Sequence, residues 1–132
     1  MKTALQIRRE LEALLVGRIG TYKLTDGSST PAVWIGGKVS NKVSSVSGIE
    51  ILINPTPDMP VEALMASEKV VRAEHFVRII QHSANTSMVE VLQLIAARFE
   101  LSGSPIVQQE TDDMAQQATV RIRDDYVLRK QP

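Results

Sequence analysis

The sequence predicts an α+β fold, with an antiparallel β-sheet, whole or split in two, and two α-helices packed on one face. Two segments, residues 3–17 and 87–99, repeat apolar residues every three or four positions, which is the period of an amphipathic helix. Further runs have strand character and lie near residues 20–35, 48–53, 69–80, 106–107 and 118–123. Because most of these runs follow one another without a helical crossover, antiparallel pairing is expected to dominate.

The helix expected at residues 3–17 carries Ile7, Leu11 and other apolar residues on one face, and most of its charges lie away from that face. Thr3 stands at the N-cap position, where its hydroxyl can accept a hydrogen bond from a free backbone N–H. Gly17 marks the end of the segment, because glycine tolerates the positive φ found at helix C-termini.

Residues 20–35 are interpreted as a β-hairpin with arms at residues 22–24 and 32–35. Asp26-Gly27 is a favoured turn dipeptide, although the loop is longer than a two-residue turn.

Two segments have no packing period. Residues 36–47, GGKVSNKVSSVS, hold two glycines, four serines and two lysines but no acid, and they predict an exposed loop. Residues 54–60 hold three prolines and predict a stiff extended connection, with a short helical turn expected at 61–67. Between them, residues 48–53 alternate in the manner of a half-buried strand. The chain, residues 1–132, is therefore interpreted as a single α+β domain with an exposed loop and a Pro-rich segment.

The second helix has the clearest boundaries. Ser87 and Glu90 have the S-x-x-E spacing of a capping box. Gly103 and Pro105 stand beyond its end, where glycine tolerates positive φ and proline cannot continue a helix. Its apolar face consists of Met88, Val91, Leu92, Ile95 and Phe99.

Composition restricts the class of protein. The chain has 132 residues, of which 43% are hydrophobic and 23% charged, which is typical of one globular domain. Lys and Arg together equal Asp and Glu at 15 each, so no global basic excess indicates a nucleic-acid partner. There is no cysteine, which excludes disulfides and thiolate chemistry. No apolar run reaches the length of a membrane span, so no membrane partner is expected.

No group of residues predicts an active site. His75 and His82 are seven residues apart, which is not a metal-ligand spacing. The adjacent acids Asp112-Asp113 and Asp124-Asp125 would point to opposite faces of a strand, so neither pair is expected to hold one substrate. We therefore expect no catalytic, cofactor-binding or metal-binding residues and no cofactor, and we expect that the chain is not an enzyme.

The order of features extends over residues 4–124: an amphipathic helix, GTYKLTDGSSTPAVWIG, GIEILINPTP, AEHFVRIIQ, a helix from near Ser87, and ATVRIRD. This order resembles the tail terminator (tail completion) proteins of long-tailed bacteriophages. The resemblance implies a structural subunit that forms a hexameric ring, caps the tail tube and joins it to the neck and connector proteins of the head. It further implies a virion protein assembled in the host cytoplasm, with DNA passing through the ring without sequence-specific binding.

Two other functions remain open at this stage. One is a head-completion or connector adaptor of the neck, which the sequence does not separate from a terminator. The other is a small nucleic-acid-binding module, for which Arg72, Arg78, Arg121 and Arg123 are the candidate phosphate contacts.

Overall fold

A computed structural model describes residues 2–36, 39–57, 61–65, 68–82, 88–109 and 116–129. Within these ranges, residues 61–65, 68–72, 108–109 and 125–129 are described by their backbone alone. No helix in the described ranges is both long and apolar enough to cross a membrane.

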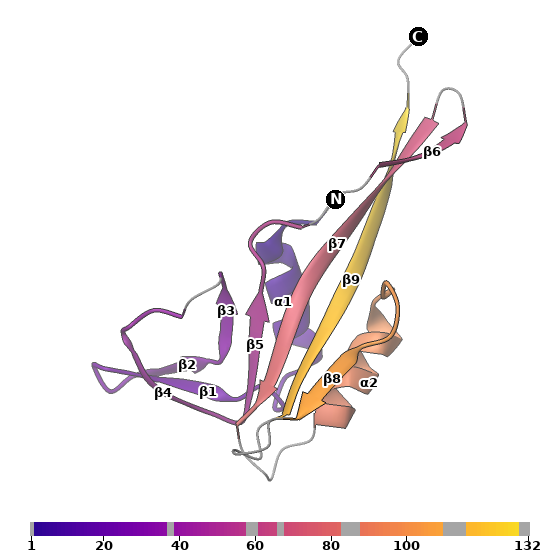
Figure 1. Ribbon diagram of the computed structural model, residues 1–132. Helices are drawn as coiled ribbons and strands as arrows, with labels where there is room; N and C mark the ends of the chain where they lie inside the picture. Colours follow the sequence, from indigo (N-terminus) through magenta and orange to yellow (C-terminus); the bar gives the residue numbers. More distant parts are fainter. Residues whose placement is uncertain are drawn as a thin grey trace.

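The chain forms two helices and two sheets (Figure 1). The elements follow in the order α1 (Ala4–Leu14), β1 (Thr21–Leu24), β2 (Ser29–Pro31), β3 (Val33–Ile35), β4 (Val43–Ser47), β5 (Ile49–Ile53), β6 (Val61–Met65), β7 (Glu68–Gln81), α2 (Met88–Arg98), β8 (Ile106–Gln109) and β9 (Gln116–Arg129).

The larger sheet has six strands in the order β3-β5-β7-β9-β8, with β6 on β7. Its described pairings are antiparallel except for β3 with β5, which is parallel. One core joins the apolar faces of both helices to the inward side chains of β5, β7 and β9. The predicted α+β fold is therefore confirmed, with the sheet split in two.

Helix α1 begins at a capping box in which the Thr3 side chain accepts from Gln6 N at 3.2 Å and Gln6 Oε1 accepts from Thr3 N at 2.8 Å. Its buried residues Ile7 and Leu11 lie on the predicted face. The chain leaves the helix at Gly17, whose φ of +80° is in the region that favours glycine.

The smaller sheet has the order β2-β1-β4 and corrects two expectations. The partner of β1 is β2, residues 29–31, and not residues 32–35, which join the larger sheet as β3. The supposed loop 36–47 contains β4 at residues 43–47, paired along all of β1. Strand β4 reads VSSVS, which has no regular alternation and no fully buried residue, so its strand state depends on backbone pairing that a period of hydrophobicity does not reveal.

Gly20 lies where the two sheets meet. Its N–H donates to Ile49 O at 2.7 Å, and its carbonyl accepts from Ala32 N at 3.0 Å. A Cβ at this position would lie 1.8 Å from Ser47 O, so only glycine lets the chain pass here. Gly48, with a φ of +76°, then turns the chain from β4 into β5.

Strands β7 and β9 are each 14 residues long and pair along their whole length. At the usual rise they span roughly 46 Å, more than the strands of a small core need. Their distal part, with β6, projects past both helices (Figure 1). We call this three-stranded ribbon, residues 61–65, 68–72 and 125–129, the arm. It corrects the helical turn expected at 61–67, because residues 61–65 pair with β7.

Helix α2 buries Met88, Val91 and Ile95, as its period predicts. Its proposed capping residue Ser87 lies outside the described residues. Gly103 has a φ of +77°, which confirms its place in the turn after the helix. Of the Pro-rich segment 54–60, residues 54–56 are exposed and Pro57 is half-buried, while 58–60 lie outside the described ranges.

Candidate functional site

The titratable side chains that the structure describes do not gather into a metal site of three or more His, Cys, Asp or Glu residues. His75 lies within β7 and is buried, whereas His82 follows the end of that strand and is exposed. Asp112-Asp113 lies outside the described ranges. Asp124 accepts a hydrogen bond from the backbone N–H of Lys2, and the side chain of Asp125 is not described.

A polar cluster joins the two sheets. Tyr22 of β1 and Glu50 of β5 are buried, with 1% and 6% of their surfaces exposed. The Tyr22 hydroxyl donates to Glu50 Oε2 at 2.5 Å, and His82 Nε2 lies 2.8 Å from Glu50 Oε1. Burial, followed by the hydrogen bond to Glu50, raises the pKa of the Tyr22 phenol above its ordinary value. The cluster therefore connects one sheet to the other through buried polar contacts.

His75 is fully buried in β7, and neither of its ring nitrogens has a hydrogen-bond partner among the residues that the structure describes. Burial lowers the pKa of this imidazole, opposed by the charge of Asp124 and assisted by that of Lys2. A neutral side chain enclosed in the core has no access to a substrate. It is a cost to stability and not a catalytic group.

The candidate basic residues lie on the sheet face opposite the helices, because they alternate with buried residues of β7 and β9. Arg121 Nη1 is 3.9 Å from Glu74 Oε2, and Arg123 Nη1 is 3.4 Å from Glu100 Oε1. Arg78 is exposed on the same face, and the side chain of Arg72 is not described. Acids therefore accompany the arginines, and the face is not a uniformly basic stripe.

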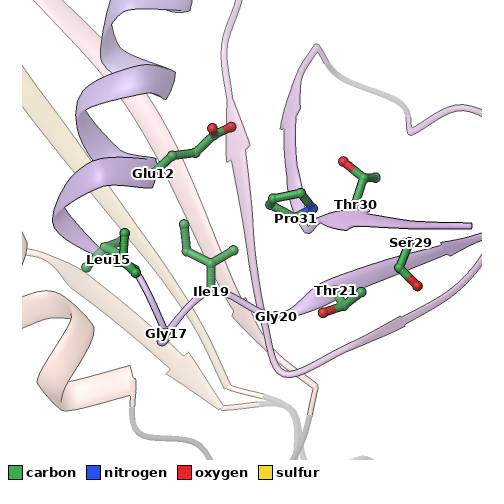
Figure 2. A pocket seen from close by; sticks show the side chains of 10 residues that line it. Glu12, Leu15, Gly17, Ile19, Gly20, Thr21, Ser29, Thr30 and Pro31 are labelled. Atoms are coloured by element: carbon green, nitrogen blue, oxygen red, sulfur yellow. The ribbon is translucent and has the colours of Figure 1, made fainter.

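A groove of about 480 Å³ lies between the end of α1 and the smaller sheet (Figure 2). Leu15, Ile19 and Pro31 contribute apolar walls, and Glu12 extends over it from the last turns of α1. The Glu12 carboxylate is already paired with Arg8 Nε at 2.7 Å. The groove is therefore mainly an apolar depression, without convergent acid, base or nucleophile among its lining residues.

Strand β8 is an open edge of the larger sheet, because among the described strands it pairs only with β9. Its residues Ile106 and Val107 are 60% and 54% exposed. Successive side chains of a strand point to opposite faces, so the edge offers an apolar residue on each face. The strand reads IVQQ and lacks the charges and prolines with which proteins usually protect such an edge.

The arm is the second open element. Strand β6 pairs with β7 alone among the described strands, and beyond Arg123 no described strand pairs with the outer edge of β9. A three-stranded ribbon needs a packed face for independent stability. The arm and β8 together present open strand edges among the described residues of the larger sheet, and they are the candidate functional site.

Sequence reasoning did not identify these surfaces. The sequence predicts a strand near Ile106-Val107 but does not indicate that its edge is open. It also predicts a last strand at 118–123, which is shorter than β9, Gln116–Arg129. The missed signal was the apolar run from Tyr126 to Leu128, which resumes strand character after the interruption at Asp124.

Comparison with known proteins finds no match: no family model, no curated protein and no solved structure is similar to this chain.

Proposed function

We propose that the chain is a structural subunit that assembles into a ring, and that the ring is the tail terminator of a long-tailed bacteriophage. The observation that carries the proposal is the arm, a β-ribbon that extends past the helices and over which no other described element of the chain is layered (Figure 1). A subunit of a larger assembly gains by such an element, because the neighbouring subunit supplies the missing contacts.

The open β8 edge supports the same proposal. A ring requires two different surfaces on each subunit, since its contacts are heterologous. The chain offers an arm and an edge strand as two such surfaces. The order of sequence features, from the N-terminal helix to ATVRIRD, resembles that of tail terminators. This resemblance is the reason for proposing a tail terminator and not another kind of ring. The proposed protein is not an enzyme, and the ring acts by shape, capping the tube and meeting the neck.

A connector or head-completion adaptor is the second candidate, because such a ring would also require two different contact surfaces on each subunit. A nucleic-acid-binding module is less favoured, since Glu74 and Glu100 lie beside two of the candidate arginines. Affinity for DNA that falls steeply with salt concentration would favour that module instead.

The test is assembly of the purified full chain. Light scattering after size-exclusion chromatography is expected to show an oligomer, alone or after addition of tail tubes from the same virus, and electron microscopy is expected to show rings at the tube end. A monomer at every concentration with no ring on isolated tails would contradict the proposal. Rings found only on portal-bearing heads would favour the connector.

A further inference from the structure

We propose that strand β8 is the site at which a second copy of this chain docks, by adding strand β6 of its arm to the open edge. This inference rests on the proposed ring and names the contact that holds it.

The acceptor is identified by comparing the open edges. Strand β2 is three residues long and contains Pro31, which has no N–H to donate. Strand β3 is also three residues long, and its Trp34 lines a hollow together with Lys42 and Val43. Strand β4, the outer strand of the smaller sheet, has five residues, but its valines Val43 and Val46 are half-buried. Strand β8 combines four paired residues, no charge and two exposed apolar side chains.

The donor follows from sheet order. Strand β6 lies on the edge of β7 that β5 also occupies, whereas β8 lies on the opposite side of the sheet, beyond β9. Joining β8 to β6 of a neighbour therefore continues the sheet with both copies facing the same way. The outer edge of β9 in the arm lies on the same side of the sheet as β8. Pairing β8 with that edge of a neighbour would therefore require the neighbour to be turned over.

Strand direction agrees with this pairing. Within one chain β8 is antiparallel to β9, β9 to β7 and β7 to β6, so β8 and β6 run in opposite directions. A neighbouring copy whose strands stay nearly parallel to those of the first keeps these directions. The new pair is therefore antiparallel, like most pairs in the sheet, and it can use the same backbone hydrogen bonds.

The contact also sets the inclination of the copies. Strand β6 pairs with β7 beginning at residue 68. Strand β8 pairs with the part of β9 that lies opposite β7 from residue 78 onwards. The two strands are therefore displaced along the sheet by roughly 33 Å at the usual strand rise. Each copy must therefore lean so that its arm lies beside the base of the next. This heterologous contact forms a ring if the rotation closes and a filament if it does not.

The first test places a charge on the edge. Ile106→Lys and Val107→Lys are expected to leave the fold intact, because both side chains are mostly exposed, and to weaken assembly by at least about tenfold, since edge lysines oppose strand addition. Val89→Lys is the matched control, because Val89 is 62% exposed on α2 and lies away from any edge. Sedimentation velocity measures the assembly of all three variants and the wild type.

The second test detects the pair directly. The chain has no cysteine, so Ala63→Cys on β6 and Val107→Cys on β8 introduce single thiols. Cα atoms across an antiparallel pair approach to roughly 4.5–5.5 Å, which a disulfide can span. Mixing the two single variants under oxidation is expected to give a cross-linked dimer, and a chain with both substitutions is expected to give a ladder.

The outcomes separate the two proposals. Normal assembly of Ile106→Lys and Val107→Lys would overturn the inference and leave the ring standing. Cross-linking of Val107→Cys with itself alone would show β8 pairing with β8 across a two-fold axis, which also overturns the inference. Filaments that require β8 would support the contact and contradict the ring. A wild-type chain that remains monomeric at every concentration and forms no ring on isolated tails overturns both.

Discussion

Tyr22 and Glu50 form a hydrogen bond of 2.5 Å between the smaller and the larger sheet, with both side chains almost fully buried. The bond lies where β1 crosses β5, and His82 approaches the second oxygen of the same carboxylate. These contacts make the attachment of the smaller sheet polar and directional, whereas the helices attach to the larger sheet by apolar packing.

Replacing the hydroxyl tests this attachment. Tyr22→Phe is expected to lower the free energy of unfolding by about 1–3 kcal/mol, because a buried carboxylate oxygen loses its donor. Urea denaturation measures the change. A double-mutant cycle with Glu50→Gln is expected to show coupling between the two positions, and independent effects would mean that the bond does not hold the sheets together.

Replacing His75 is expected to raise stability, in contrast to replacing Tyr22. His75→Leu is expected to raise the free energy of unfolding by about 1–3 kcal/mol, since two buried nitrogens without partners are replaced by an apolar side chain of similar size. Thermal unfolding at pH 8 measures the gain. A less stable His75→Leu variant would show that the imidazole makes contacts in solution that the structure does not record.

The same residue makes stability depend on pH. The folded pKa of His75 lies below its ordinary value of 6.5 because of burial, so the unfolded chain binds a proton that the folded chain does not. No stability is lost above the ordinary pKa, and stability falls as the pH drops below it. The difference in melting temperature between His75→Leu and the wild type is therefore expected to widen below pH 6.5. A constant difference from pH 8 to pH 5 would contradict this assignment.

The crossing at Gly20 predicts a large steric effect. Gly20→Ala is expected to cost more than about 3 kcal/mol, beyond ordinary overpacking, because the added Cβ meets backbone oxygen and not a flexible side chain. Gly17→Ala is the control, since Gly17 has positive φ but open space around it, and about 1–2 kcal/mol is expected there. Chemical denaturation compares the two variants, and equal costs would show that the close approach relaxes freely.

The face of α2 predicts a further contrast. Ile95→Asp is expected to abolish cooperative folding, because an unpaired charge in the core costs several kcal/mol, comparable with the stability of a small domain. The neighbouring Ala96 is exposed, so Ala96→Asp introduces the same charge with a change of less than about 1 kcal/mol. Circular dichroism during heating distinguishes them, and an unchanged melting temperature for Ile95→Asp would mean that the helix is oriented differently.

Several features of the fold could be read from residues alone. Both helices were predictable because an apolar stripe such as Ile7 and Leu11 buries itself wherever the chain supplies a surface. The central part of β7 was predictable because its buried positions alternate, and β5 because Ile49, Ile51 and Ile53 recur at every second position, although Glu50 between them is also buried. The cap at Thr3 and the turn at Gly103 depend on local backbone geometry, so their residue types reveal them.

Tertiary structure decided the rest. Residues 43–47 became a strand because β1 offers an edge to pair with, and residues 32–35 left the hairpin because β5 lies within reach of their backbone. The arm and the exposure of β8 depend on where covering layers end, which no local pattern records. Pairing between distant segments is a property of the whole sheet. The sequence by itself therefore determined the helices and the strands with a clear apolar period, and the assembled structure determined strands such as β4 and which edges stay open.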